Sequence, residues 1–341
     1  MKKYKPYSTG DPLIDNEIKL LANKYSHTKT QEFFRQLFTT IIKLHLDHAE
    51  TADLHLINTT LKELRHAFRV FTPYRSQRKI AVFGSHRISR NSHEYKLSEE
   101  FCREIAKRGF LVITGGGGGI MEAGNKGAGE KSFAAKIRIA AEQLNPYIPK
   151  GEKVITFNYF FNRKLIFIKE SDATVLFPGG FGTQDEGFEV LTLLQTGKCT
   201  PRPIIMMENK KGYWKFWLKF IKDKLIKGGF LTKEDLTLFS VVKNAKDAIA
   251  EIENFYRVYH SIRYSKDLTI VRLNRELSPA AYKTLNQKFK DILTHGTIQP
   301  CQALPIEKKN GEHPHLPRLQ MYFNQKSFTR LQQFVKELNT L

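Results

Sequence analysis

The chain has 341 residues, of which 41% are hydrophobic and 26% are charged. This balance is typical of a soluble globular protein of about two domains, and it excludes collagen-like, disulfide-scaffold and intrinsically disordered chains. The 55 lysines and arginines outnumber the 34 aspartates and glutamates, and the resulting net charge of +21 favours phosphorylated or polyanionic ligands without naming a reaction.

The first 75 residues are predicted to form a helical extension. Apolar residues recur at helical spacing over residues 32–46 and again over 54–70, and Pro73 ends the pattern. We interpret this extension as an element for packing or oligomerisation. His45, Asp47 and His48 lie on it, but solvated helix positions explain them better than a metal site does.

From Lys79 the pattern changes to short apolar runs that alternate with helical segments. Strands are predicted at residues 79–84, 110–114, 135–139, 154–157, 173–177 and 203–207. Helices are predicted up to Gly109 after the first strand and later at residues 160–170, 183–195, 213–227 and 245–259. Apolar strands separated by helices indicate a parallel sheet with both faces covered. We therefore expect an α/β fold, a Rossmann-like doubly wound domain, over residues 76–260.

The last part of the chain, residues 261–341, is predicted to be a small α+β domain. A strand is expected at 268–273, and Ser278 and Pro279 supply the cap and first turn of a helix ending near Gly296. Strands at 298–304 and 316–323 and a helix from Ser327 complete it.

Two glycine-rich loops each join a predicted strand to a predicted helix. The first, residues 115–119, is a run of five glycines, and the second, residues 178–183, reads PGGFGT. Glycines let the backbone approach a ligand, and free N–H groups at a helix start attract phosphate. Two such loops at strand ends indicate a ligand crevice. Each loop alone also fits a tight turn, and Thr183 with Glu186 also fits a capping box.

A helix with mostly apolar positions carries Arg163 and Lys164 near its start. A solvated face explains Lys164 readily. Arg163 offers the planar fork that suits a phosphate or a carboxylate.

The segments GGGGGIMEAGNKGA, FNRK and PGGFGTQDEGFEVLTLLQTGK together resemble the LONELY GUY family, whose members are cytokinin-activating phosphoribohydrolases and related nucleoside 5'-monophosphate nucleosidases, often labelled lysine decarboxylases. The resemblance covers residues 79–256. Residues 1–75 and 261–341 look like the extensions of longer bacterial forms, and EQLNPY (residues 142–147) resembles a long-form loop near the base site. Asp185 stands where the family usually has glutamate, and Gly118 where long forms often have proline.

The resemblance implies cleavage of an AMP-like nucleotide to free base and ribose 5-phosphate, without cofactor or metal, by a homo-oligomer. It assigns catalysis to Arg163 and Glu186. The substrate-binding residues that we expect are Gly84, Ser85, Gly116, Gly117, Gly119, Met121, Glu122, Lys164, Pro178, Gly179, Gly180, Phe181, Gly182 and Thr183.

Two other functions stay open at this point. A non-catalytic nucleotide sensor or carrier would use the same loops, and a basic protein of related fold would bind nucleic acid through its net charge. The lysine- and aromatic-rich segment 213–227 fits a membrane surface less well than a helix that packs Trp214 and Trp217 on the sheet.

The cytoplasm is the expected compartment. No apolar run reaches the about 20 residues that span a bilayer, and residues 1–10 lack the apolar stretch of a secretory signal. The three cysteines, Cys102, Cys199 and Cys301, have neither disulfide nor zinc spacing.

Overall fold

The computed structural model describes residues 7–27, 30–139, 143–149, 151–208, 210–265 and 267–341. The chain divides into two compact units, Met1–Arg65 and His66–Leu341. No helix of the described residues is both long and apolar enough to span a membrane.

The first unit is helical. It contains α1 (Pro12–Tyr25), α2 (Gln31–Leu46) and most of α3 (Thr51–Phe71). The two helices predicted here are confirmed as α2 and α3. The sequence pattern missed α1, whose start is fixed locally, because the Asp11 carboxylate accepts the backbone N–H groups of Leu13 and Ile14.

The second unit is built on a seven-stranded sheet in the order β4-β3-β2-β1-β5-β6-β7, with every neighbouring pair parallel. The strands are β1 (Lys79–Phe83), β2 (Leu111–Thr114), β3 (Ser132–Ile137), β4 (Val154–Phe157), β5 (Ala173–Leu176), β6 (Ile204–Met207) and β7 (Ser240–Val242). All six predicted strands are present, although β3 starts three residues before its predicted place. The pattern missed β7, which is short and only half-buried.

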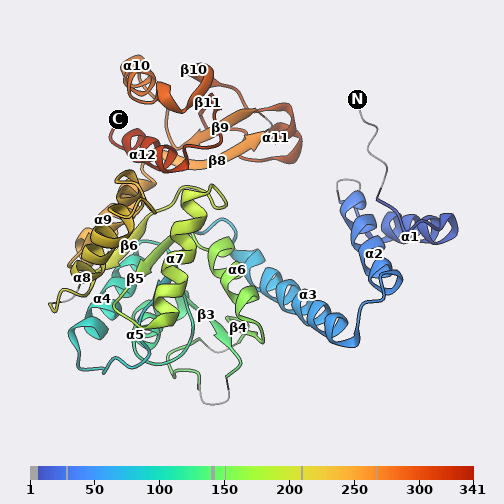
Figure 1. Ribbon diagram of the computed structural model, residues 1–341, viewed down its shortest axis with the longest axis horizontal. Coiled ribbons are helices and arrows are strands. Elements are labelled where there is room, and N and C mark those ends of the chain that lie inside the picture. Colours follow the sequence, from blue (N-terminus) through green and yellow to red (C-terminus); the bar gives the residue numbers. More distant parts are fainter. Residues whose placement is uncertain (1–6, 28–29, 140–142, 150, 209, 266) are drawn as a thin grey trace. The chain divides into compact units, whose positions relative to one another are not determined.

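Helices cover both faces of this sheet (Figure 1), which confirms the predicted doubly wound fold. They are α4 (His93–Lys107), α5 (Ile120–Ala128), α6 (Phe160–Glu170), α7 (Phe181–Gln195), α8 (Tyr213–Phe220) with its π-helical continuation Ile221–Ile226, and α9 (Ala245–Phe255). Segment 213–227 buries Trp214 on the sheet, as predicted, but it is not one α-helix.

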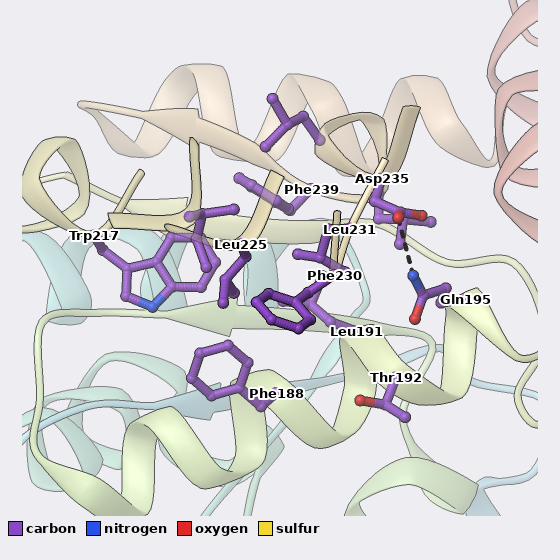
Figure 2. Close-up of a pocket in the computed structure, with 13 residues that line it drawn as sticks. Phe188, Leu191, Thr192, Gln195, Trp217, Leu225, Phe230, Leu231, Asp235 and Phe239 are labelled. Atoms are coloured by element: carbon purple, nitrogen blue, oxygen red, sulfur yellow. Dashed lines mark hydrogen bonds between the residues drawn. The ribbon is translucent and has the colours of Figure 1, made fainter. Parts of the chain in front are cut away.

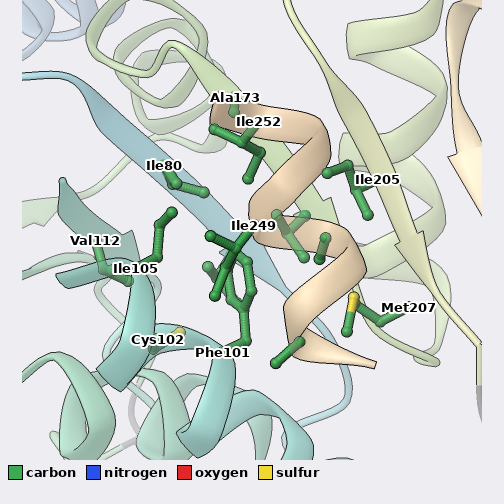
Figure 3. Packing of buried hydrophobic residues seen from close by; sticks show 14 of the residues in the cluster. Ile80, Phe101, Cys102, Ile105, Val112, Ala173, Ile205, Met207, Ile249 and Ile252 are labelled. Carbon is green, nitrogen blue, oxygen red and sulfur yellow. The ribbon is translucent and has the colours of Figure 1, made fainter. Parts of the chain in front are cut away.

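The central core lies where α4 and α9 pack on the sheet. Figure 3 shows Phe101 of α4 and Ile249 and Ile252 of α9 against Ile80 of β1. These side chains are almost fully buried. On the other face, Val190 of α7 joins a second apolar cluster with α8. Because both faces are covered, the strands are mostly apolar, which is why their pattern was readable in the sequence.

The chain winds outward from the middle of the sheet in both directions. β1 lies between β2 and β5, the strands β2 to β4 follow on one side, and β5 to β7 follow on the other. The strand order therefore reverses between β1 and β5. In open α/β sheets, ligands bind outside the carboxyl ends of the strands at such a reversal.

The C-terminal part of the second unit has its own antiparallel sheet in the order β10-β11-β9-β8. It comprises β8 (Tyr259–Ser265), β9 (Leu268–Leu273), β10 (Leu293–Cys301), β11 (Arg318–Phe323), α10 (Pro279–Lys288), α11 (Pro305–Asn310) and α12 (Phe328–Leu338). This arrangement confirms a small α+β element. The boundaries at residues 75/76 and 260/261 stay predictions.

Several bounds differ from those predicted in this region. The helix expected to end near Gly296 ends at Lys288, and Gly296 lies in β10 at a register shift with a φ of 70°. The helix expected to reach Tyr259 ends at Phe255, so that Tyr259 opens β8. Apolar residues at this spacing fit a half-buried strand as well as a helix, and pairing with β9 decides between them.

Candidate functional site

Three loops meet at the reversal point of the parallel sheet. Ser85 follows β1, the five glycines follow β2, and Pro178 follows β5. The Ser85 N–H donates to the Pro178 carbonyl at 3.1 Å, and the Ile120 N–H donates to the Ser85 carbonyl at 3.1 Å. The structure thus brings together the sequence-predicted residues Gly84, Ser85, Gly119, Pro178 and Gly179.

Close backbone approach explains two of these glycines. Gly119 has a φ of 61°, and a Cβ there would lie 2.3 Å from the carbonyl oxygen of Ser85. A Cβ on Gly179 would lie 2.1 Å from Oγ1 of Thr183. Both distances are far below any real contact, so these positions require glycine. Gly180 and Gly182 are different, because a Cβ on either would meet open space among the described residues.

The second glycine loop opens α7 without a side-chain cap. Gly180 is the N-cap and the helix begins at Phe181, so Glu186 lies beyond the first turn. The capping-box interpretation of Thr183 and Glu186 is therefore wrong. The Phe181 side chain is 96% exposed, so Phe181 contributes its backbone and not its side chain to the contacts of this loop. An uncapped helix start leaves N–H groups available for an anion.

The two predicted catalytic residues face each other from neighbouring helices. Arg163 lies on α6 and Glu186 on α7, with 3.9 Å between Nη2 and Oε1, and the Glu186 side chain is only 3% exposed. Next to them, the Lys164 ammonium pairs with Asp185 at 2.9 Å and with Glu189 at 2.7 Å. Lys164 is thus engaged by two carboxylates beside the pair.

Burial dominates the electrostatics of Glu186. It raises the pKa of this carboxyl from its usual 4.5 to about 7, although Lys164 and Arg163 both act to lower the pKa. Oε2 of Glu186 is buried and has no hydrogen-bond partner among the described residues. A buried carboxylate with one oxygen unpartnered is a candidate for contact with a reacting group.

The raised pKa makes a prediction for stability. The pKa of Glu186 is higher in the folded protein than in the unfolded chain, so protonation of Glu186 stabilises the folded state. This stabilisation is complete below about pH 4.5 and is lost as the pH rises through about 7. Glu186→Gln has no carboxyl to ionise. Its free energy of unfolding relative to wild type should therefore rise by about 2 to 3 kcal/mol between pH 5 and pH 8. Urea unfolding at both values measures this, and a constant difference would contradict it.

Glu122, a predicted substrate-binding residue, is held by two side chains. Its Oε1 accepts Nε of Arg90 at 2.6 Å and the hydroxyl of Tyr95 at 3.0 Å, and Glu122 is 8% exposed. These contacts join the segment after β1 to α5. Its neighbour Met121 packs its sulfur against Gly115. Both side chains therefore support the first glycine loop from within the protein.

Asn145 is a site residue that sequence reasoning did not single out. Its buried Nδ2 donates to the carbonyls of Gly116 and Gly117, each at 3.0 Å, and to Oδ1 of Asn125 at 2.9 Å. Asn145 thus fixes the predicted residues Gly116 and Gly117 from a distant part of the chain. The NPY letters within EQLNPY were the signal available, but residues 140–142 of that region lie outside the described part.

A separate apolar pocket of about 200 Å³ lies on the side of α7 that faces away from Glu186. Figure 2 shows Phe188 and Leu191 of α7 opposite Trp217 and Phe230. Its lining is mostly apolar and offers no cation to a phosphate, so we do not place it in the candidate site.

Comparison with known proteins finds one matching family and several sequence relatives. Residues 117–252 match the family described as "Possible lysine decarboxylase". A cytokinin riboside 5'-monophosphate phosphoribohydrolase of Arabidopsis thaliana (LOG3) is 28% identical over 182 residues, which are 52% of this chain and 83% of that protein. A probable enzyme of the same description from Oryza sativa subsp. japonica (LOGL9) is 28% identical over 190 residues, covering 53% of this chain and 80% of that protein.

Among solved structures, the molybdenum cofactor binding protein of Rippkaea orientalis aligns with 52% of this chain and 96% of its own, at 16% identity and a TM-score of 0.39. The matched residues 117–252 include Arg163, Glu186, the second glycine loop and the end of the first. Residues 117–252, which lie within the Rossmann-like part, match the family described as possible lysine decarboxylases, and over about half of its length the chain is similar to LOG phosphoribohydrolases.

Proposed function

We propose that this protein hydrolyses the N-glycosidic bond of a nucleoside 5'-monophosphate, with AMP as the default substrate, and releases the free base and ribose 5-phosphate. The observation that carries the proposal is the Glu186 carboxylate, buried beside Arg163 and with Oε2 unpartnered among the described residues. The printed names of the sequence relatives support the same reaction.

Glu186 suits this chemistry because the bond breaks toward the base. The electron pair of the C1'–N bond leaves with the base, and positive charge develops on the ribose. Water adds its oxygen to C1' and keeps one proton as the new hydroxyl group, while its other proton ends on the base nitrogen. A fixed carboxylate beside C1' stabilises that charge and orients the water. The pKa of about 7 implies that the ionised form is fully available only above neutral pH.

The phosphate of the substrate would bind at the glycine loops. The backbone at Gly119 and Gly179 approaches its neighbours more closely than any side chain would permit, and α7 begins without a side-chain cap. The backbone N–H groups of these loops and of the first turn of α7 can hold a phosphate without a metal. Since the phosphate is remote from the broken bond, its binding energy can hold the sugar in a reactive pose.

Arg163 would act either on the phosphate or by positioning Glu186. Its guanidinium lies 4.8 Å from the ring centroid of Phe160 and 3.9 Å from Glu186. A planar fork held in this way is not replaced by an ammonium group. Arg163→Lys should therefore fall toward the activity of Arg163→Ala in steady-state AMP hydrolysis. Activity within about threefold of wild type would contradict the requirement for a fork.

The direct test is to incubate the purified protein with a panel of nucleoside monophosphates and to detect free base and ribose 5-phosphate by chromatography. Release of base in step with ribose 5-phosphate supports hydrolysis. Saturable nucleotide binding without any release of base would instead favour the non-catalytic carrier.

The proposal also includes an oligomeric state and a cellular compartment. Phe160, Phe161 and Leu165 of α6 are each about half exposed beside the candidate site, which favours a homo-oligomer that covers them. Sedimentation equilibrium would refute this by giving the 39.5 kDa of one chain. The three free cysteines fit the reducing cytoplasm.

A further inference from the structure

A groove of about 1120 Å³ lies at the carboxyl ends of β6 and β7, on the same edge of the sheet as the glycine loops. We call it the lysine groove, because its lining includes Lys210, Lys211, Lys215, Lys219, Lys222 and Lys243. It adjoins the candidate site through Tyr213, the first residue of α8, whose hydroxyl donates to the Gly179 carbonyl at 2.5 Å.

The two carboxylates in the groove are already engaged. Glu208 accepts the backbone N–H groups of Trp214 at 3.3 Å and Lys215 at 2.8 Å, which caps α8. Asp223 pairs with Lys227, one turn along the chain, at 2.8 Å. Both carboxylates therefore already hold groups of α8 and of Lys227, at the end of its π-helical continuation.

Most of the lysines in the groove have no ion-pair partner in the described part of the chain. Within the described ranges, no carboxylate lies within ion-pair distance of Lys210, Lys215, Lys219, Lys222 or Lys243, and all five are exposed. By contrast, Lys164 in the candidate site pairs with two carboxylates. Like charges that share a concave surface repel one another and concentrate counter-anions there.

The spacing of the lysines indicates the shape of the anion. Lys215, Lys219 and Lys222 follow one another on successive turns of α8 and its π-helical continuation, over about 10 Å. A single carboxylate or phosphate is shorter than this row, whereas a chain of phosphates extends along it. Among the described residues that line the groove there is no arginine, and so no planar fork that selects carboxylates, whereas lysine binds phosphate as a point charge.

We propose that the lysine groove binds an oligophosphate, meaning a short chain of directly linked phosphate groups. Such a chain presents several negative charges within the length of the lysine row. Single-stranded nucleic acid spaces its phosphates more widely and is held by successive aromatic platforms. Among the described lining residues, the exposed rings are Phe216 of α8 and His93 at the start of α4, which lie on different elements and form no row. The proposal does not rest on the hydrolase function, because it uses neither Arg163 nor Glu186.

The test measures binding by isothermal titration calorimetry on the full chain. Inorganic tripolyphosphate, ATP and orthophosphate are titrated at low salt and again at 150 mM salt. Tripolyphosphate should bind far more tightly than orthophosphate and should weaken with salt. The triple variant Lys215→Gln/Lys219→Gln/Lys222→Gln should lose about tenfold or more in affinity, because it removes three charge-assisted hydrogen-bond donors. Glutamine keeps a good helix propensity, so α8 should remain folded.

A matched control separates the groove from net charge. Lys233→Gln/Lys283→Gln/Lys290→Gln removes the same charge from exposed lysines outside the groove, and it should bind tripolyphosphate like wild type. Circular dichroism and thermal unfolding check both variants. If the triple variant in α8 is destabilised, Lys210→Gln/Lys243→Gln, which leaves α8 untouched, should show a loss of affinity in the same direction.

The outcomes are distinct. Tighter binding of ATP than of tripolyphosphate, reduced by Phe216→Ala, identifies a nucleoside triphosphate as the source, and equal binding identifies the phosphate chain alone. The proposal is overturned by an absence of saturable tripolyphosphate binding, or by equal losses in groove and control variants. It is also overturned if a twelve-nucleotide single strand binds the groove and tripolyphosphate does not displace it. Loss of AMP hydrolysis has no bearing on any of these readouts.

Discussion

Glu186→Gln is expected to lower kcat for AMP hydrolysis by about a hundred- to a thousandfold, because loss of one preorganised electrostatic group typically has this effect. Glutamine keeps the shape of the side chain on α7 but carries no charge to stabilise the ribose as the base leaves. Nucleotide affinity should change little, since the glycine loops and Arg163 are unaltered. Steady-state detection of adenine measures kcat, and fluorescence or calorimetric titration measures affinity.

Two controls make this result interpretable. The matched variant Glu189→Gln alters a neighbouring carboxylate of α7 that pairs with Lys164, and it should retain most of its turnover. The stability of Glu186→Gln at pH 8, expected above that of wild type, excludes misfolding as the cause of a loss. Turnover of Glu186→Gln near the wild-type rate would leave Glu186 a structural residue and would remove the main support for the proposed reaction.

Adenosine is expected to be a far poorer substrate than AMP, by about 10⁴-fold in kcat/KM, because a site built to hydrogen-bond a group rejects an analogue that lacks it. The difference should appear in kcat as well as in KM, since phosphate binding holds the sugar near Glu186. Initial rates of adenine release from both compounds measure it.

Orthophosphate provides a control for this second prediction. If the glycine loops hold the phosphate, millimolar orthophosphate should inhibit AMP hydrolysis competitively and should leave the slow cleavage of adenosine unaffected or faster. Comparable kcat/KM values for AMP and adenosine would reject the assignment of a phosphate to the loops at Gly119 and Gly179.

The sequence by itself determined the class of fold and the types of residue in the site. Because the central strands are covered on both faces, their apolar runs were clear, and β6, predicted at residues 203–207, lies at Ile204–Met207 with every residue buried. The five-glycine run and PGGFGT marked two strand-to-helix turns for a steric reason, because only glycine fits at Gly119 and Gly179. Where a strand is short or half-buried, as in β7 and β8, this signal faded.

Only the tertiary structure decided how these residues meet and what charge they carry. No local pattern states that β1 pairs with β5, yet this pairing ties Ser85 to Pro178. The raised pKa of Glu186 arises from burial between α6 and α7, and the ion pair of Glu122 with Arg90 joins residues 32 positions apart in the chain. Burial and long-range hydrogen bonds depend on residues far apart in the chain, so single-sequence periodicity, which reports on neighbours, carries no information about them.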